Sequence, residues 1–448
     1  KTIDLIIVGP EVPLVNGIVD FFTSRKIKIF GPDQFAAQLE GSKSFMKDLC
    51  NEHSIPTAQY EKFQNSDDAI KYLETQSYPI VIKADGLAAG KGVTIAEDFK
   101  TASIAVEDIF NAKFGANMDV VIEEFMYGEE ASYFICSDGK NFISLISAQD
   151  HKRIGENDTG PNTGGMGAYS PAPVFTEKVK KQVDDEIIKP TLKAMFDKGH
   201  PFKGILYAGL MIENEKAKLV EYNIRFGDPE CQVLMMSLKS DLIDLIMHSI
   251  NGSINDYVCD WYDEDCATVV LASKGYPGEF KKDTEIKGLE NIKTSQSLQV
   301  FHAATIESDK KILANGGRVL NVTCRQNNLE FLLEIITSKE CEANDEDILN
   351  VVDNIYRIGV RPDWWKLEPL KEKENWLKLE ELIFKWDKFC RGVLLLGLDR
   401  PIKKLDICFK LAKSSKIVKG FAVGRSIFGK VAENWFSGKI SNSDAVEL

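Results

Sequence analysis

The sequence lacks paired cysteines and long apolar runs, and each shortage excludes a class of protein. Its nine cysteines are scattered, odd in number and form no C-x-x-C pair, which argues against a zinc site and a disulfide framework. We therefore expect a cytoplasmic protein. No apolar run approaches about 18 residues and no charged-then-apolar leader is present, so the sequence predicts neither a membrane span nor a signal peptide.

Positive charge is also in short supply, because the formal net charge is −13. This deficit argues against broad binding of nucleic acid or anionic membranes, so a local cluster such as Lys83 and Lys91 should meet any polyanion. We expect small-molecule partners. With 448 residues, 44% apolar and 27% charged, the chain suits a globular protein of several domains. It begins without Met in a strand-like run, so we expect a fragment.

The stretch Pro79–Ile95 has the pattern of a phosphate-binding turn. An apolar strand delivers Lys83, and a second β-branched strand leaves the turn. The turn contains three glycines and a lysine, namely Gly86, Gly90, Lys91 and Gly92. Glycines let backbone N–H groups close on phosphate oxygens, and Lys83 would neutralise their charge. The Walker spacing is absent. An ordinary hairpin with a surface lysine is the alternative, and these residues alone favour neither.

The N-terminal stretch alternates strand and helix patterns. It predicts strands over Ile3–Val8 and Ile27–Phe30, a helix over Val12–Ser24 and a helical segment over Gly31–Cys50. Lys43 and Lys47 are four residues apart in the last segment, so a helix would place them on one face. Solvated surface lysines are the alternative interpretation.

A β-rich run over Val120–Ile122 ends in polar residues that suit a nucleoside. Acidic and aromatic residues follow it, namely Glu123, Glu124, Phe125, Glu129 and Glu130. A strand end with free backbone groups beside carboxylates suits an adenine edge and ribose hydroxyls. A solvated acidic turn is the alternative.

Gln149–Ala168 has five glycines and too few apolar residues to pack, so we expect an extended loop. Long loops of this kind are usually functional or disordered.

A β-hairpin is predicted over Gly204–Ile212 and Lys218–Asn223. Alternation along its second strand places Glu221 and Asn223 on one face. Carboxylate and amide oxygens presented together are hard ligands for Mg²⁺. Polar residues on an outward sheet face are the alternative, although Arg225 and Asp228 follow directly.

The last third of the chain has a strand-then-helix rhythm. Strands are expected at Leu332–Ile336, Trp364–Leu367, Val393–Leu396 and Gly420–Val423. Their spacing of about 30 residues is typical of βα units, as in half of an eight-fold barrel or a small doubly wound sheet. Lys366, Glu368, Asp399 and the Gly420–Ser426 turn lie at strand ends, where such folds place chemistry. For Lys366 an ion pair with a carboxylate is the alternative.

Eight motifs in the first 325 or so residues resemble the glycinamide ribonucleotide synthetase family of ATP-grasp enzymes, which are phosphoribosylamine–glycine ligases. In chain order they are GPEVPLVNGI, QLEGSKSFMKD, VIKADGLAAGKGV, EEFMYGEEAS, AQDHKRIGENDTGPNTGGMGAYSPAP, YAGLMI, VEYNIRFGDPECQ and GGRVLNVT. Long matches in family order are specific, so the resemblance favours the phosphate-binding reading of Pro79–Ile95.

The resemblance also implies a role for each matching residue. Lys47 and Lys83 would contact the phosphates of ATP, under a mobile loop over Gly86–Val93. Glu123, Glu124 and Phe125 would line the adenine, Glu130 would bind the ribose, and Glu221 and Asn223 would hold Mg²⁺ or Mn²⁺. Arg225, Asp228 and a loop would surround glycine and its activated form. The loop residues are Asp158, Thr159, Gly160, Asn162, Thr163, Gly164 and Gly165.

The implied reaction is phosphoryl transfer from ATP to the glycine carboxylate, followed by attack of the 5-phosphoribosylamine nitrogen on the acyl phosphate. No Ser-His-Asp or Cys-His pairing stands out in the sequence. None is required, because ATP activates the substrate while the protein supplies positioning and charge neutralisation.

The expected fold class is a multidomain α/β and α+β protein with an ATP-grasp fold. We expect a partial pre-ATP-grasp α/β domain at 1–40, an ATP-grasp domain at 41–252 with a lid near 57–127, and an α+β domain at 253–326. Residues 329–448 resemble the aldolase-like domain of 5-dehydro-2-deoxygluconokinase through IGVRPDWWKLEP, CRGVLLLGLD and VKGFAVGRSIF.

Two departures from the family keep alternatives open. The chain starts after the family's first strand and its GGREHA-type loop, and the tail replaces the family's final helix at a junction near Thr323–Leu332. A nucleotide-binding but inactive chain is therefore one alternative. An enzyme of sugar-acid catabolism, acting through the tail, is a second. The sequence leaves the oligomeric state open, with a monomer as one option.

Overall fold

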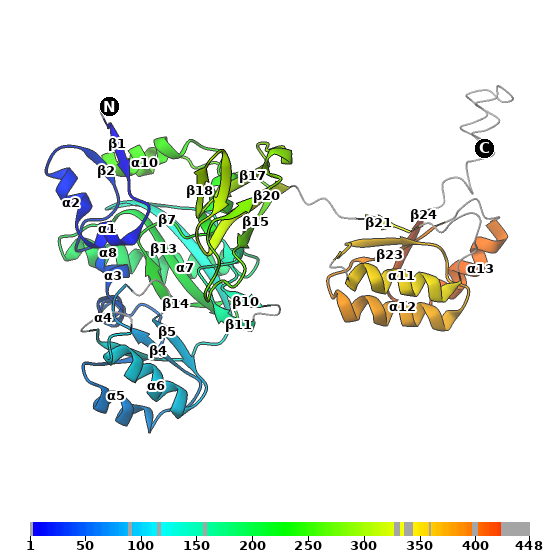
Figure 1. Ribbon diagram of the computed structural model, residues 1–448, viewed down its shortest axis with the longest axis horizontal. Helices are drawn as coiled ribbons and strands as arrows, with labels where there is room; N and C mark the ends of the chain where they lie inside the picture. Colours follow the sequence, from blue (N-terminus) through cyan, green and yellow to red (C-terminus); the bar gives the residue numbers. More distant parts are fainter. Residues whose placement is uncertain are drawn as a thin grey trace. The chain divides into compact units, whose positions relative to one another are not determined.

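The computed structural model describes residues 3–87, 92–113, 118–155, 159–326, 332–335, 344–357, 360–396 and 402–422. It divides into two compact units, residues 1–327 and 328–448 (Figure 1). The predicted site residues Gly90, Lys91 and Asp158 lie outside the described residues, as does Asp399.

The N-terminal segment contains two parallel strands, β1 (Leu5–Ile7) and β2 (Lys28–Phe30). The single helix expected over Val12–Ser24 is wrong, because the structure has α1 (Glu11–Val15) and α2 (Ile18–Thr23). Gly17 separates them with a φ of 80°, a left-handed conformation that interrupts a helix. The next helical segment is likewise divided, into α3 (Gln38–Gly41) and α4 (Lys43–Glu52), by the extended Ser42. The Ser42 side chain caps α4 by accepting a hydrogen bond from the Phe45 N–H at 3.1 Å.

A four-stranded sheet in the order β3-β6-β4-β5 follows. Its strands are β3 (Tyr60–Phe63), β4 (Ile80–Ala84), β5 (Val93–Ala96) and β6 (Val120–Glu124). Helices α5 (Ser66–Leu73) and α6 (Phe99–Phe110) pack their apolar faces on it. The two strands expected on either side of the glycine turn are confirmed, because β4 and β5 pair antiparallel.

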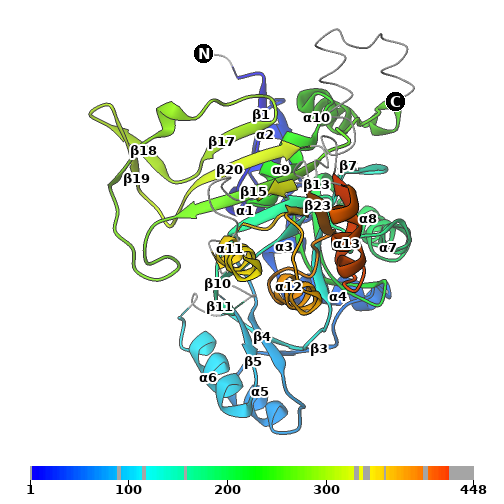
Figure 2. The same cartoon turned by 90° about the vertical axis from the view of Figure 1, so that its right-hand side faces the viewer.

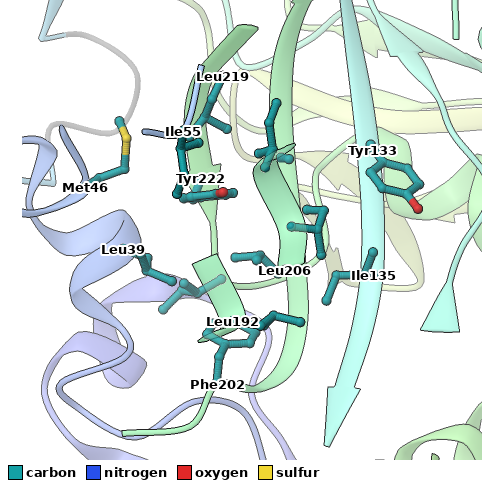
Figure 3. Packing of buried hydrophobic residues seen from close by; sticks show 14 of the residues in the cluster. Leu39, Met46, Ile55, Tyr133, Ile135, Leu192, Phe202, Leu206, Leu219 and Tyr222 are labelled. Carbon is teal, nitrogen blue, oxygen red and sulfur yellow. The ribbon is translucent and has the colours of Figure 1, made fainter. Parts of the chain in front are cut away.

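The central antiparallel sheet has the order β14-β13-β7-β8. Its strands are β7 (Glu129–Asp138), β8 (Phe142–Ser144), β13 (Lys203–Glu213) and β14 (Lys216–Asn223), and β13 with β14 form the predicted hairpin. The cluster on one face includes residues of α3, α4, α7 (Glu177–Val183), η1 (Asp184–Ile188) and α8 (Lys189–Asp197). Figure 3 shows Leu39 and Met46 of the N-terminal helices packing toward Leu219 and Tyr222 of β14. Helices α9 (Glu230–Ser237) and α10 (Leu242–Asn251) contribute to a second cluster, with residues of β7 and β13.

A five-stranded sheet in the order β17-β20-β15-β12-β9 completes the first unit, and β17, β20 and β15 lie side by side in Figure 2. Its strands are β9 (Gln149–Asp150), β12 (Gly167–Ser170), β15 (Asp265–Ala272), β17 (Leu298–His302) and β20 (Arg318–Gln326). A smaller sheet and two short helical turns lie nearby in the chain, namely β16 (Thr284–Ile286), β18 (Thr305–Ser308), β19 (Lys311–Ala314), η2 (Ile254–Asp256) and η3 (Leu289–Asn291).

The glycine-rich segment Gln149–Ala168 is not the extended loop that we expected. It contributes β9, the start of β12 and a two-stranded ladder of β10 (Arg153–Gly155) with β11 (Thr159–Asn162). Strands are predicted from alternating apolar and polar residues, which mark one buried face and one exposed face. β11 is exposed on both faces, so it has no such alternation.

The second unit is a parallel sheet in chain order, β21-β22-β23-β24, which confirms the expected βα rhythm. Its elements are β21 (Leu332–Glu334), α11 (Asp345–Arg357), β22 (Trp364–Leu367), α12 (Lys373–Trp386), β23 (Gly392–Leu396), α13 (Ile402–Ala412) and β24 (Val418–Ala422). Trp365 and Val393 belong to the buried cluster that includes Tyr356 and Trp376 from the helices. Lys366 pairs with Glu334 at 3.0 Å, as in the ion-pair alternative. Among the described residues, no helix is long and apolar enough to cross a membrane.

Candidate active site

Two lysines and one carboxylate form the buried centre of the site. Lys47 Nζ, from α4, lies 3.0 Å from Glu123 Oε2, and Lys83 Nζ, at the end of β4, lies 2.9 Å from Glu123 Oε1. Lys83 pairs with Val121, so Glu123 is its diagonal neighbour on the same face of the sheet. The exposed fractions are 0% for Lys47, 5% for Lys83 and 2% for Glu123. The trio contains two cationic side chains and one anionic side chain in a place that water hardly reaches.

Burial lowers the pKa of Lys47, and the attraction of Glu123 opposes that shift. Lys47 Nζ also donates a hydrogen bond to Thr57 Oγ1 at 2.8 Å. The structure thus brings together Lys47, Lys83 and Glu123, but the Glu123 side chain faces the lysines. The Glu124 carboxylate accepts hydrogen bonds from Lys218 and from the Gln59 N–H. The adenine contact implied for Glu123, Glu124 and Phe125 stays a prediction.

The N-terminus of α4 holds the base of the glycine turn. Lys43 Nζ donates a hydrogen bond to the Gly86 carbonyl at 2.9 Å. The Asp85 carboxylate accepts hydrogen bonds from Ser42 Oγ at 3.1 Å and from the Ser44 N–H at 3.2 Å. Sequence reasoning missed Asp85 and left Lys43 as a surface alternative. The signal for Lys43 was a helix-capping serine followed by lysines four residues apart, and the signal for Asp85 was its place between Lys83 and Gly86.

Glu221 and Asn223 lie on one face of β14, as predicted. Tyr222 between them is buried in the core on the other face, while both predicted ligands are half-buried. Burial tends to raise the pKa of Glu221, but the charges of Lys152, Lys83 and Lys43 outweigh it and hold the pKa below its ordinary value. The Glu221 carboxylate is therefore ionised at neutral pH and is surrounded by positively charged side chains.

A small cavity beside Glu221 is lined by further charged groups, including Glu130 and Asp150. Lys152 Nζ lies 2.6 Å from Glu130 Oε2 and 4.0 Å from Asp150 Oδ2. Glu130, predicted to bind a ribose, is thus paired with a lysine of the glycine-rich segment. Lys152 was missed, because only the fold brings this segment against β7.

Glu230, at the start of α9, is a buried carboxyl group that sequence reasoning also missed. It accepts a hydrogen bond from the Tyr207 hydroxyl at 2.9 Å. Burial and the nearby Asp150 raise the pKa of Glu230 to about 7. The only signal for Glu230 in the sequence was its position directly after Asp228-Pro229.

Arg225 and Asp228 contact different partners. Arg225 Nε lies 2.8 Å from Glu11 Oε2, and its Nη2 lies 3.0 Å from Glu40 Oε1. Asp228 instead accepts hydrogen bonds from Gln232 at 2.9 Å and from Arg318 at 2.8 Å. Arg225 is therefore bound to the N-terminal segment, while the half-exposed Asp228 is bound to α9 and β20.

In the described part of the predicted substrate loop, Thr159, Gly160 and Asn162 are exposed. The residues that follow them are held by hydrogen bonds. Thr163 Oγ1 donates to the Lys152 carbonyl at 2.7 Å and accepts from the Gly165 N–H at 3.0 Å. Gly165 has a φ of 105°, and a Cβ there would approach Pro229 Cδ to 2.5 Å. Only glycine fits this contact between the loop and the Asp228-Pro229 turn.

This arrangement places a cluster of lysine side chains next to a group of carboxylates. Lysine ammonium groups suit phosphates, and carboxylate and amide oxygens suit a hard divalent cation. Among the described residues, no group of three or more His, Cys, Asp or Glu side chains is arranged to hold a metal ion. A metal here would rest on few protein oxygens and on substrate oxygens.

Family models match most of the chain. Residues 1–40 match the phosphoribosylglycinamide synthetase N domain, and residues 41–231 match the ATP-grasp (A) domain of the same synthetase. Residues 296–448 match a family described as an uncharacterized protein conserved in bacteria. This last match begins inside the first compact unit, at the residues just before β17.

Similar proteins agree with these matches. A phosphoribosylamine–glycine ligase of Brucella melitensis biotype 1 is 52% identical over 379 residues, which cover 84% of this chain and 86% of the relative. The crystal structure of a phosphoribosylamine–glycine ligase from Thermotoga maritima has a TM-score of 0.62 and 32% identity, over 69% of this chain and 77% of that one. A biotin carboxylase from Campylobacter jejuni, with a TM-score of 0.58 and 16% identity over 72% of this chain and 71% of that one, shares the fold alone. The chain therefore belongs to the phosphoribosylamine–glycine ligase family, the phosphoribosylglycinamide synthetases.

Proposed function

We propose that this chain joins glycine to 5-phosphoribosylamine, using ATP and forming glycinamide ribonucleotide, ADP and phosphate. The observation that carries the proposal is the buried pair of Lys47 and Lys83 around Glu123, adjoining the Glu221 carboxylate. The names and identity of the relatives support the same reaction.

The lysines fit the phosphates of ATP because their charges are not fully balanced. Glu123 supplies one negative charge for the two ammonium groups of Lys47 and Lys83, whereas the charge of Lys43 is offset by the nearby Glu221 and Asp85 carboxylates. Bound phosphate oxygens would restore the balance in a site with little access to water. In this proposal Lys47 and Lys83 hold the phosphates, and Lys43 supports the glycine turn above them through Gly86.

Glu221 and Asn223 fit a divalent cation, Mg²⁺ or Mn²⁺. Their oxygens lie on one face of β14, and neighbouring lysines keep Glu221 ionised. When bound, the ion would supply positive charge that offsets the negative charge of the phosphates. Arg225 would help orient the amide, because its Nη2 lies 3.5 Å from Asn223 Oδ1.

Asp228 fits the ammonium group of glycine, since its carboxylate is half-exposed beside the glycine-rich segment. With glycine held there, a carboxylate oxygen of glycine attacks the γ-phosphorus and ADP leaves. The amine nitrogen of 5-phosphoribosylamine then attacks the carbonyl carbon of glycyl phosphate, loses a proton and expels phosphate. The protein's part is to position these groups and to neutralise charge.

We further infer the domains, the partners and the compartment of the chain. We take 1–40, 41–252, 253–326 and 329–448 as its domains. Small molecules are its partners, and the cytoplasm is its compartment.

A coupled assay of ADP release tests the proposal. With freshly made 5-phosphoribosylamine, ATP and Mg²⁺, the full chain should release ADP only when glycine is also present. Mass spectrometry should then detect glycinamide ribonucleotide in an amount equal to the ADP. Binding of ADP without any turnover would contradict the proposal and favour the inactive nucleotide-binding alternative.

A further inference from the structure

Arg318, the first residue of β20, reaches across to two segments of the candidate glycine site. Its Nη1 donates hydrogen bonds to the carbonyl oxygens of Gly164 at 2.5 Å, Gly165 at 3.3 Å and Asp228 at 2.6 Å. Its Nη2 donates to Asp228 Oδ2 at 2.8 Å. One side chain thus connects the glycine-rich segment to the turn that follows β14.

The strand that carries Arg318 is a rigid support. β20 pairs with β15 on one side and with β17 on the other, and the adjoining Val319 and Leu320 are buried. The Arg318 side chain is largely covered, with 21% of it exposed. A planar fork of several N–H donors can bind several oxygens at once, whereas a single ammonium group cannot match that geometry.

Both carboxylate oxygens of Asp228 are held. Arg318 binds Oδ2, and Gln232 Nε2 donates to Oδ1 at 2.9 Å. The plane of the carboxylate is therefore fixed from two sides. Without Arg318, Asp228 would lose one of these contacts, and the two glycine carbonyls would lose their shared donor.

We propose that Arg318 is a positioning residue for glycine, which holds the Asp228 carboxylate and the Gly164-Gly165 segment in the arrangement that receives this substrate. The inference rests on the proposed function. It adds a residue from the domain at 253–326 to the glycine site. It also separates glycine binding from nucleotide binding, because the Arg318 bonds described above do not reach Lys47, Lys83 or Glu123.

Gly164 offers an independent way to disturb the same contact. A Cβ at Gly164 would lie 2.9 Å from Cζ and Nη2 of Arg318, and the residue has no left-handed φ that would strain an alanine. Gly164→Ala should therefore displace the end of a flexible side chain and leave the backbone in place. If both substitutions act through one contact, their effects on glycine binding should not add.

The test is isothermal titration calorimetry on the full chain with glycine, in the presence of Mg²⁺ and a non-hydrolysable ATP analogue. Arg318→Ala and Gly164→Ala should each raise the Kd for glycine roughly tenfold or more, since charge-assisted hydrogen bonds are lost. The double variant should bind glycine no more weakly than Arg318→Ala. Arg318→Lys should fail to restore binding, and the Kd for the ATP analogue should stay within about twofold in every variant. Arg357→Ala is the matched control, because Arg357 pairs with an aspartate on the exposed face of α11.

Three results would overturn the inference. They are a glycine Kd that is unchanged in Arg318→Ala, full recovery in Arg318→Lys, or an equal loss of nucleotide and glycine affinity. If the unaltered chain bound the nucleotide but no glycine, the proposed function would fall and this inference with it. If the unaltered chain bound glycine and the variants bound it equally well, only the role of Arg318 would fall.

Discussion

Glu123 Oε1 lies 2.9 Å from Lys83 Nζ in an ion pair that is almost closed to solvent. The other carboxylate oxygen lies 3.0 Å from Lys47 Nζ, so two cations share one anion. A buried group of this kind contributes little net stability when it is intact, but removing one partner leaves charges that neither water nor protein compensates. The trio therefore links the stability of the first unit to its affinity for phosphate.

Replacing Glu123 by glutamine should destabilise the first unit strongly. The change removes the only carboxylate of the trio and leaves two buried ammonium groups, at a cost of about 3–5 kcal/mol. Chemical denaturation measures the loss of free energy of unfolding. The control is Asp48→Asn, whose carboxylate pairs with Lys62 in an exposed place and should cost no more than about 1 kcal/mol. Equal losses in the two variants would contradict the importance assigned to the buried carboxylate.

Lys83→Met should lower the affinity for ATP. The substitution keeps an unbranched apolar stem but removes the charge, so Glu123 and Lys47 would then neutralise each other and leave no surplus for phosphate. We expect the Kd for ATP, measured by calorimetry, to rise roughly tenfold or more. Lys62→Met, on the exposed face of β3, is the control and should leave the Kd unchanged. An unaltered Kd in Lys83→Met would rule out the phosphate contact.

Glu221→Gln should weaken metal binding while the fold is kept, because it removes one charge and little volume. Bound Mn²⁺, followed by electron paramagnetic resonance in the presence of ATP, should need roughly tenfold more metal for half-saturation. Glu213→Gln, at the exposed end of β13, is the control. Because the pKa of Glu221 is held below 4.5, metal binding by the unaltered chain should persist as the pH falls to about 5. Equal half-saturation in Glu221→Gln and the unaltered chain would exclude the ligand role.

Glu230 should make the free energy of unfolding depend on pH. Its carboxyl group has a pKa of about 7 in the folded chain against an ordinary value of 4.5, so between these values the folded state holds a proton that the unfolded state has released. The contribution of this carboxyl group to the free energy of unfolding is complete below about pH 4.5. It is lost as the pH rises to about 7, by up to about 3 kcal/mol. In Glu230→Gln this decline should be absent from denaturation midpoints measured across that range. A decline of the same size in Glu230→Gln would assign it to other groups.

Local patterns predicted much of the fold. Trp364–Leu367 was recognised with its observed bounds, because an apolar run among charged residues marks a buried parallel strand. The Glu221 and Asn223 face was predictable because strand alternation is a local property. The breaks at Gly17 and Ser42 were missed, although both are local, because the apolar periodicity continues across them.

Residues that act through distant contacts could not be found in this way. Lys152, Glu230 and Arg318 gain their roles from partners brought near by the fold, and Arg318 is more than a hundred residues from Gly164. The β10 and β11 strands are polar and glycine-rich, so no core-facing pattern marked them. The order of the motifs is a property of the sequence, so it pointed to the correct family. The contacts of individual site residues depend on the fold, so they had to come from the structure.

The central claim is that glycine is activated as an acyl phosphate, and isotope transfer tests it most directly. The full chain is incubated with ATP, Mg²⁺, 5-phosphoribosylamine and glycine labelled with ¹⁸O in its carboxylate, and the inorganic phosphate is examined by mass spectrometry. Our account predicts that each phosphate formed contains one ¹⁸O atom, because the carboxylate oxygen bonded to phosphorus leaves with it. Phosphate without ¹⁸O, formed together with glycinamide ribonucleotide, would contradict the account.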